Sequence, residues 1–148
     1  MSDDTKFATT VIHSGPGVDP QTGALWPPIV LSSTFAQEAP GKHQGFEYSR
    51  TGNPTRQALE KAIADLEGGA HGLAFASGCA ATSAVVHLLK SGDHIVAGND
   101  LYGGTYRLFT SVYEKFGIQT TYVDTTDASQ VEAAMRPETK VVWIPNFS

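Results

Sequence analysis

The residues best suited to chemistry lie in three short glycine-containing segments, and the first is typical of a phosphate site. Ser77, Gly78 and Cys79 follow the short apolar run 72–76 and precede a helical pattern. Free backbone N–H groups at the start of a helix, together with the helix dipole, attract anions. Gly78 has no side chain to block a phosphate. Taken alone, the segment fits an ordinary strand-to-helix turn equally well, with Cys79 as a small buried residue.

The other two segments contribute an aromatic ring and a cation. Tyr102 precedes Gly103 and Gly104, so its ring can face an open cleft and stack on a planar heteroaromatic ligand. Tyr48 supplies a hydroxyl and Arg50 a bidentate guanidinium, a pairing suited to phosphate. By themselves these segments also fit a glycine turn with a surface tyrosine and a solvated turn before a helix.

The sequence gives little support for other kinds of active site, for nucleic-acid or membrane binding, or for secretion. The chain contains no GxxxxGK[ST], GxGxxG, GxSxG or HExxH pattern, and its five histidines are scattered, so we expect no metal site. The net charge of −5 is unfavourable for binding nucleic acid or an anionic membrane. Cys79 is the single cysteine, and we find neither a signal peptide nor an apolar run long enough to cross a membrane. These features favour a cytoplasmic protein.

The positioning elements alternate in a way that is typical of parallel βαβ units. Residues 59, 62, 63 and 66 form one apolar face of a helix that Thr55 caps and the glycines at 68–69 end. Further helices are expected from the first site segment to residue 89, over 106–116 before Gly117, and after Asp127, which Gln130 helps to cap. Strands are expected at 72–76, 94–97, 120–123 and 140–144. The predicted fold class is therefore α/β, and ligands should lie at the carboxyl ends of the strands.

The first 54 residues differ from the rest of the chain. They hold six of the eight prolines and little helical periodicity, which predicts an extended path. We interpret residues 1–54 as an arm that wraps its own domain or a neighbouring subunit, and residues 55–148 as an α/β domain.

In order and context, the three segments closely resemble the Cys/Met-metabolism family of pyridoxal-phosphate (PLP) enzymes. That family includes cystathionine γ-synthase, cystathionine γ- and β-lyases and methionine γ-lyase. The resemblance implies an N-terminal arm followed by the first half of a mainly parallel, three-layer, aspartate-aminotransferase-like domain. It is carried by the runs Phe46-Glu47-Tyr48-Ser49-Arg50-Thr51-Gly52-Asn53-Pro54-Thr55-Arg56, Phe75-Ala76-Ser77-Gly78-Cys79-Ala80-Ala81 and Asp100-Leu101-Tyr102-Gly103-Gly104-Thr105-Tyr106-Arg107.

The same resemblance implies a role for each matching position. The cofactor is PLP, which acts as an electron sink when its phosphate and ring are fixed. The stacking residue, Tyr102, is also the implied catalytic residue through proton relay. The implied cofactor phosphate ligands are Ser77, Gly78 and Cys79 from the same subunit, and Tyr48 and Arg50 from the neighbouring one. The implied substrate contacts at the distal end are Glu47 and Arg107.

The implied activity is cleavage or formation of a carbon–sulfur bond in transsulfuration, by a homotetramer that takes cystathionine, a homoserine ester or cysteine. Glu47 with Arg107 favours a cystathionine γ-lyase or γ-synthase. Gly104 stands where methionine γ-lyases typically carry cysteine. Methionine γ-lyase and cystathionine β-lyase activities remain alternatives.

The family's Schiff-base lysine has a Ser-x-Thr-Lys context that no lysine of this sequence shares. The resemblance also ends after Ile144. We therefore expect these 148 residues alone to be inactive and prone to aggregate, as a fragment of a longer enzyme. The alternative is a non-catalytic accessory chain whose Tyr48 and Arg50 complete a partner subunit's site.

Overall fold

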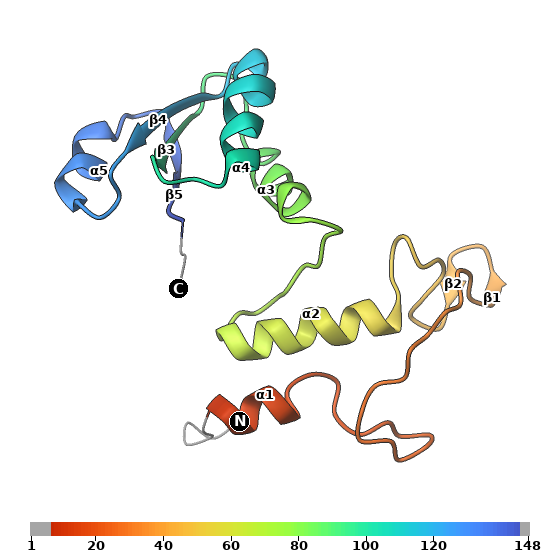
Figure 1. Ribbon diagram of the computed structural model, residues 1–148. Coiled ribbons are helices and arrows are strands. Elements are labelled where there is room, and N and C mark those ends of the chain that lie inside the picture. The colour runs from red at the N-terminus through yellow and green to blue at the C-terminus, as the bar shows by residue number, and fades with distance from the viewer. Residues whose placement is uncertain (1–6, 146–148) are drawn as a thin grey trace. The chain divides into compact units, whose positions relative to one another are not determined.

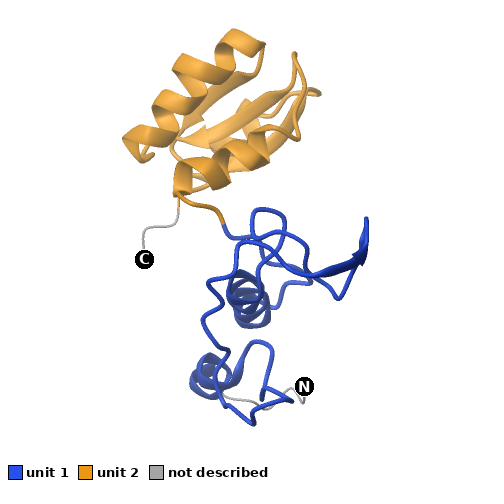
Figure 2. Cartoon of the chain, turned by 90° about the vertical axis from the view of Figure 1, so that its right-hand side faces the viewer, with its two compact units in different colours: residues 1–74 blue, residues 75–148 orange. Residues whose placement is uncertain are grey.

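The computed structural model describes residues 7–145, and the chain forms two compact units, Met1–Ala74 and Phe75–Ser148 (Figure 2). The helix predicted after residue 54 therefore groups with the N-terminal segment. The proposed boundary between an arm and a domain at residue 54 stays a prediction. The residues after Pro145 lie outside the described part of the chain.

Unit 1 is built around the helix α2, Pro54–Glu67 (Figure 1). Asn53, not Thr55 as the sequence suggested, caps this helix: its side chain accepts the Thr55 N–H at 2.9 Å, and Pro54 takes the first helical position. Gly68 ends the helix in the left-handed conformation, with φ of 65°, as predicted.

The rest of unit 1 is mostly irregular, with two exceptions. A short helix, α1 (Phe7–His13), lies where only extended chain was expected, and β1 (Gln37–Ala39) pairs with β2 (Lys42–His43) as a small antiparallel hairpin. The expectation of a wholly extended arm was wrong because α1 packs against α2, an interaction that a search for local periodicity does not detect.

Unit 2 is a three-stranded parallel sheet in the order β4-β3-β5, with β3 (His94–Gly98) between β4 (Gln119–Val123) and β5 (Thr139–Trp143). The helices that connect or precede these strands are α3 (Gly78–Val86), α4 (Gly103–Arg107) and α5 (Ala128–Ala134). Helix α4 continues as a π-helical turn, Leu108–Val112, and a 3₁₀ turn, Tyr113–Phe116, that ends at Gly117 with φ of 83°. The predicted parallel α/β arrangement is confirmed.

Two further element predictions were wrong, one at the boundary between the units and one in unit 2. Residues 72–76 form no strand: the Ala74 N–H donates to the Glu60 carboxylate at 3.0 Å, so it takes no part in a ladder. Helix α3 ends at Val86 and not at residue 89, because the N–H groups of Leu88 and Leu89 bond carbonyls only three residues back.

The core of unit 2 lies between β3 and the helices that cover it. Ile95 and Ala97 are fully buried, and they pack with Val86 of α3 and with Phe109 and Tyr113 of the long helix. Each fully buried aliphatic or aromatic side chain contributes about 1.5–3 kcal/mol to stability. This core holds the end of α3 against β3 and the helix that follows it.

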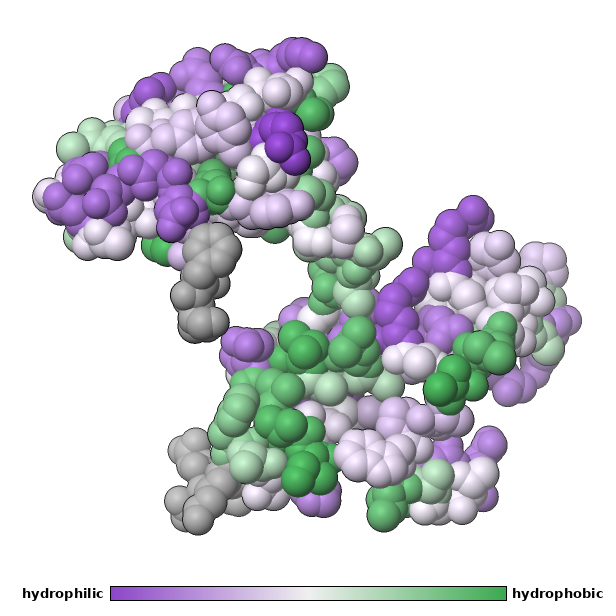
Figure 3. Space-filling model, in the orientation of Figure 1, coloured by the Kyte–Doolittle hydropathy of each residue, from purple (hydrophilic) through white to green (hydrophobic). Residues whose placement is uncertain are grey.

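Apolar surface gathers over α1 and α2 in unit 1 (Figure 3). On α2, Leu59 is 54% exposed and Ile63 48% exposed, although the sequence pattern assigns both to a buried face. The predicted helix is thus confirmed, but the described residues leave its apolar face about half exposed. Among these residues, no helix is both long and apolar enough to cross a membrane.

Candidate cofactor site

The start of α3 presents two backbone donors without a partner. Ser77 has an extended backbone, with φ of −159° and ψ of 161°, and its Oγ accepts the Ala80 N–H at 3.1 Å. The Ser77 carbonyl accepts the Ala81 N–H at 3.1 Å. Across residues 7–145, the N–H groups of Gly78 and Cys79 meet no acceptor. These two groups point out of a nine-residue helix at its positive end, which is the arrangement that binds anions.

The space next to these donors is open. A Cβ atom built on Gly78 would meet nothing within 4 Å, and Gly78 and Ser77 are both exposed. A phosphate can therefore approach the backbone closely, and the residues present fit the anionic end of a phosphorylated cofactor. The Ser77 hydroxyl already accepts a capping bond, but its hydrogen is still available for donation.

Tyr102 lies next to this helix start. It follows the carboxyl end of β3, and its carbonyl accepts the Tyr106 N–H at 3.1 Å as α4 begins. A Cβ built on Gly104 would lie 3.0 Å from Tyr102 Cδ1 and 3.2 Å from Cys79 Sγ. The ring of Tyr102 and the thiol of Cys79 therefore converge on one point, although the two residues are far apart in sequence. The Tyr102 side chain is 65% exposed, so one ring face is free for stacking.

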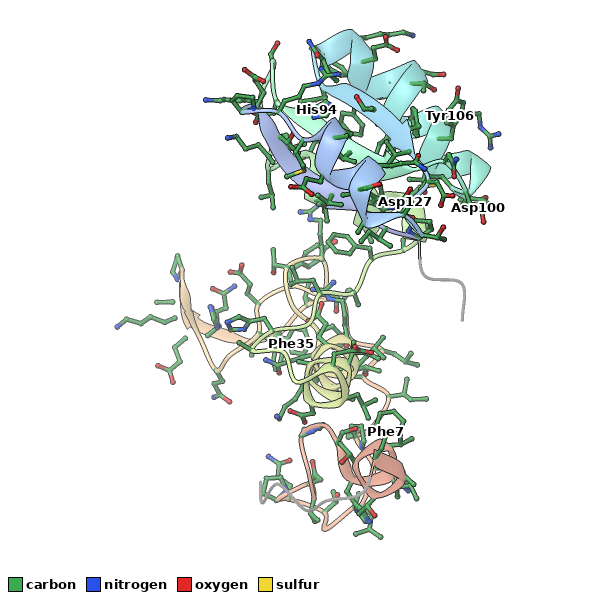
Figure 4. The ribbon with its side chains drawn as sticks, turned by 90° about the vertical axis from the view of Figure 1, so that its left-hand side faces the viewer. Phe7, Phe35, His94, Asp100, Tyr106 and Asp127 are labelled. Carbon is green, nitrogen blue, oxygen red and sulfur yellow. The ribbon has the colours of Figure 1, made fainter. Side chains whose placement is uncertain are left out.

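Figure 4 shows Asp100, two residues before Tyr102, at the opposite end of unit 2 from His94. Since His94 begins β3, the candidate site lies at the carboxyl end of the sheet, where parallel α/β folds bind their ligands. Arg107 is exposed on α4, and its Nη1 would lie 3.5 Å from a Cβ built on Gly103.

The Tyr48 and Arg50 pair lies in unit 1 on a short bridged segment. The Phe35 N–H donates to the Glu47 carbonyl at 3.0 Å and the Ser49 N–H to the Ser33 carbonyl at 2.9 Å, so Tyr48 sits between two backbone bonds. The Arg50 guanidinium carbon lies 5.0 Å from the centre of the Tyr48 ring, within the range of a cation–π contact. Both side chains are exposed, as is Glu47, so all three are accessible to a ligand.

Two further residues hold this segment and were not singled out from the sequence. Arg56 donates to the carbonyls of residues 49, 50 and 51 at 3.3, 3.4 and 3.0 Å. Asn53 Nδ2 donates to the Val30 carbonyl at 3.2 Å and to Ser49 Oγ at 3.0 Å. The Asn-Pro pair, which favours a turn before a helix, was the available signal for Asn53. Arg56 also lies 3.6 Å from the Glu60 carboxylate, four residues on, and that spacing was the available signal for an ion pair on α2. Its bonds to backbone carbonyls left no signal in the sequence.

Two other features do not belong to the candidate site. A pocket of about 650 Å³ in unit 1 lies between the prolines at 16, 20, 27 and 28 and helix α2, and includes none of the site residues named above. In unit 2, burial raises the pKa of Tyr122 to about 12, with smaller effects of Tyr106 and Glu114. The buried hydroxyl of Tyr122 has no partner in the described part of the chain, so it stays protonated at neutral pH and is no base.

Comparison with known proteins identifies a family for this chain. The family model described as "Cys/Met metabolism PLP-dependent enzyme" matches residues 8–148, so the expectation that the resemblance ends after Ile144 was wrong. A cystathionine beta-lyase of Coxiella burnetii is 52% identical over 95% of this chain and 36% of that protein, and a cystathionine gamma-lyase of Bos taurus is 55% identical over 93% and 34%. The crystal structure of metB from Corynebacterium glutamicum superposes with a TM-score of 0.90 at 48% identity, covering 95% of this chain and 37% of that one.

The chain thus spans about a third of the length of the relatives it matches. The solved relative shares the fold over nearly all of this chain, which confirms the predicted fold class. The match to the family model confirms the predicted cofactor together with the family. The chain belongs to the Cys/Met-metabolism family of PLP-dependent enzymes.

Proposed function

We propose that this chain forms the cofactor end of a PLP-dependent enzyme that breaks or makes a carbon–sulfur bond in cystathionine metabolism. The observation that carries the proposal is the convergence of two unpartnered backbone donors, at Gly78 and Cys79, with the exposed ring of Tyr102. The two N–H groups suit the phosphate of PLP, and the tyrosine ring beside them suits its pyridine ring. The names of the relatives agree with this class of reaction.

Each group has a separate task in the proposed site. The N–H groups of Gly78 and Cys79 and the hydroxyl of Ser77 hold the phosphate, and the Tyr102 ring stacks on the pyridine. When bound, PLP supplies an electron sink for charge that develops on the amino-acid substrate. The Tyr102 hydroxyl, exposed beside that ring, accepts and returns a proton during catalysis.

Tyr48 and Arg50 supply the second part of the phosphate site. Their exposure, and the separate unit that carries them, suit a role in which they reach the cofactor of a neighbouring subunit. On this proposal the protein is a cytoplasmic homotetramer, and residues 1–54 are the arm that contacts the neighbouring subunit. Glu47 and Arg107 then contact the distal end of the substrate.

Within the family, we favour a cystathionine γ-lyase or γ-synthase. Glu47 and Arg107 support this choice, and Gly104 is unlike the cysteine typical of methionine γ-lyases. The relatives' names do not separate the activities, because a β-lyase and a γ-lyase match with 52% and 55% identity. The products do: γ-elimination from cystathionine yields a four-carbon 2-oxo acid, β-elimination yields pyruvate, and γ-replacement yields cystathionine from a homoserine ester and cysteine.

The test uses the intact natural protein that contains these residues, loaded with PLP and assayed for each product. We expect the four-carbon 2-oxo acid or newly formed cystathionine, and pyruvate as the main product would refute the choice of a γ-enzyme. Tyr102→Phe should lower kcat by about 10²–10⁴ if its hydroxyl transfers a proton. Tyr106→Phe is the matched control, because this ring, one helical turn away, packs on Tyr122 with centres 5.2 Å apart.

The 148-residue chain gives a second comparison. We expect it to release no 2-oxo acid by itself. Catalysis in this family requires the lysine that binds PLP covalently, and no lysine of this sequence has the Ser-x-Thr-Lys context of that residue. If the isolated chain instead restores activity to an intact subunit carrying Arg50→Ala, the accessory-chain alternative is favoured.

A further inference from the structure

Two side chains of α2 contact the two chain segments that the proposed site uses for phosphate. Arg56 donates to three consecutive carbonyls of segment 48–52, those of residues 49, 50 and 51, at 3.3, 3.4 and 3.0 Å. Glu60, one helical turn on, accepts the Ala74 N–H at 3.0 Å, three residues before Ser77 caps α3. We propose that Arg56 and Glu60 are a positioning pair that joins these two phosphate-binding segments.

The link between the two segments runs through a single atom. Glu60 Oε1 lies 3.6 Å from Arg56 Nε, and the same oxygen accepts the Ala74 N–H. The side chains of Arg56 and Glu60 are 35% and 23% exposed, so solvent screens them only in part. Hydrogen bonds that share a group strengthen one another. Removing either donor therefore frees the carboxylate to rotate and weakens its bond to the other donor.

The planar guanidinium of Arg56 suits this position. It presents Nη1 and Nη2 to the carbonyls of segment 48–52 and Nε to Glu60. The ammonium of lysine is a compact point charge and cannot span the same partners. The carbonyls belong to a turn in which the N–H groups of Thr51 and Gly52 both bond the Tyr48 carbonyl at 3.0 Å. Arg56 thus fixes the turn from which the side chains of Tyr48 and Arg50 extend.

A second ion pair on α2 provides a matched control. Lys61 Nζ lies 3.1 Å from the Asp65 carboxylate, at the same spacing of four residues. Within residues 7–145, Lys61 donates to Asp65 and to neither phosphate-binding segment. Partly exposed ion pairs of this kind contribute little to stability by themselves. Lys61→Met and Arg56→Met therefore remove equivalent ion pairs, and only the second removes the link.

The consequence for the cofactor rests on the proposed function, whereas the link itself does not. On that proposal, Tyr48 and Arg50 serve the cofactor of a neighbouring subunit, and the start of α3 serves the cofactor of this subunit. The pair on α2 then connects the phosphate ligands of one site to those of the next.

The first test is hydrogen exchange on the intact protein without cofactor. Loss of a hydrogen bond to a charged group should raise the exchange rate of the donating amide roughly tenfold, so Glu60→Ala should do this at Ala74. If the segments are joined, Glu60→Ala should also raise exchange at residues 51–52, and Arg56→Met should raise it at Ala74. Lys61→Met should change neither rate.

The amides of residues 62–66, inside α2, separate a broken link from a general loss of stability. A loss of stability alone would raise exchange throughout unit 1 by one factor, so the changes at Ala74 and at residues 51–52 should exceed those at 62–66. Equal changes at all three places would overturn the proposal. It also fails if Glu60→Ala affects Ala74 alone and Arg56→Met affects residues 51–52 alone.

A conservative variant decides the question even if Arg56→Met does not fold. Arg56→Lys keeps a cation beside Glu60 but not the planar fork. Exchange should therefore rise at residues 51–52, while Ala74 keeps a rate close to that of the unmodified protein. Unchanged exchange at residues 51–52 would mean that the charge alone suffices, and would refute the role assigned to Arg56.

The second test adds PLP. Arg56→Lys should weaken PLP binding roughly tenfold, the scale of one charge-assisted hydrogen bond. It should have no further effect once Tyr48→Phe and Arg50→Ala together have removed the groups that Arg56 positions. The same loss in both backgrounds would contradict a role through those two residues. If the unmodified protein binds no PLP, the proposed function fails, whereas the exchange rates still report on the link.

Discussion

Replacing Thr139 by valine should loosen the network of side chains that joins all three strands of unit 2. The Thr139 hydroxyl lies 2.8 Å from His94 Nδ1 and accepts the Arg136 backbone N–H at 2.8 Å. The other ring nitrogen of His94 lies 2.9 Å from the hydroxyl of Thr121 on β4. His94 is 1% exposed, so its freed nitrogen would have no replacement partner among residues 7–145. Arg136 is exposed, so water can replace the hydroxyl as the acceptor of its N–H.

The expected loss follows from that difference in exposure. A buried polar group left without a partner costs about 1–3 kcal/mol, and valine keeps the shape of threonine, so little else changes. We expect Thr139→Val to lower the free energy of unfolding by about 1–3 kcal/mol. Thr120→Val is the matched control, since the Thr120 hydroxyl forms no hydrogen bond within residues 7–145 and its loss should cost under about 0.5 kcal/mol.

Urea denaturation followed by the fluorescence of Trp143 measures both variants. Trp143 lies on β5 and packs edge-on against Phe109, with ring centres 5.7 Å apart, so it reports on unit 2. Trp26, the other tryptophan of these 148 residues, belongs to unit 1 and is removed by Trp26→Phe in every variant. Equal free energies for Thr139→Val and Thr120→Val would refute the view that the His94 network stabilises the sheet.

Three further predictions concern pH, a helix cap and two arginines. Burial lowers the pKa of His94, assisted by the charge of Arg136 and opposed by that of Glu138. The unfolded chain therefore binds more protons below about pH 6.5, and the stability of the fold should fall as the pH drops from there through the folded-state pKa. His94→Gln should abolish this pH dependence of the urea midpoint. Ser77→Ala removes the cap of α3 and should lower the unfolding free energy by about 0.5–2 kcal/mol, and an unchanged melting temperature would contradict this. Arg56→Ala should lower the unfolding free energy of unit 1 by about 1 kcal/mol. Arg50→Ala should leave the melting temperature of unit 1 unchanged and weaken PLP binding in titrations. The reverse result would make Arg50 the structural residue and Arg56 the cofactor ligand.

Much of unit 2 could be predicted because its signals are local. The run from His94 is β-branched and apolar enough for a buried strand, and β3 is buried at every position. Asp127 caps α5 as expected, accepting the Ser129 N–H at 2.9 Å, and Gln130 bonds Asp127 Oδ2 at 3.3 Å. Gly117 ends the long helix in the left-handed conformation, which glycine adopts without steric cost.

The errors arose where a partner decides the conformation. An apolar run such as 72–76 can form a strand only beside another strand, and here its Ala74 N–H is bonded to a side chain of α2. The face of α2 that includes Leu59 and Ile63 has the right periodicity for burial, but the described residues do not cover it. Periodicity indicates which side of an element is apolar and says nothing about what lies against it.

In the candidate site, too, the residues could be selected from the local sequence, and their placement could not be predicted. Residue type and order made Ser77, Gly78, Cys79 and Tyr102 candidates, because glycine at a helix start suits an anion and an aromatic beside glycines suits a planar ligand. Their roles stay predictions. Their mutual placement was not predictable, because it depends on α3 and α4 packing on the same core. The surroundings of Gly104 show why: the Tyr102 ring and the Cys79 thiol come together there from segments that are far apart in the sequence.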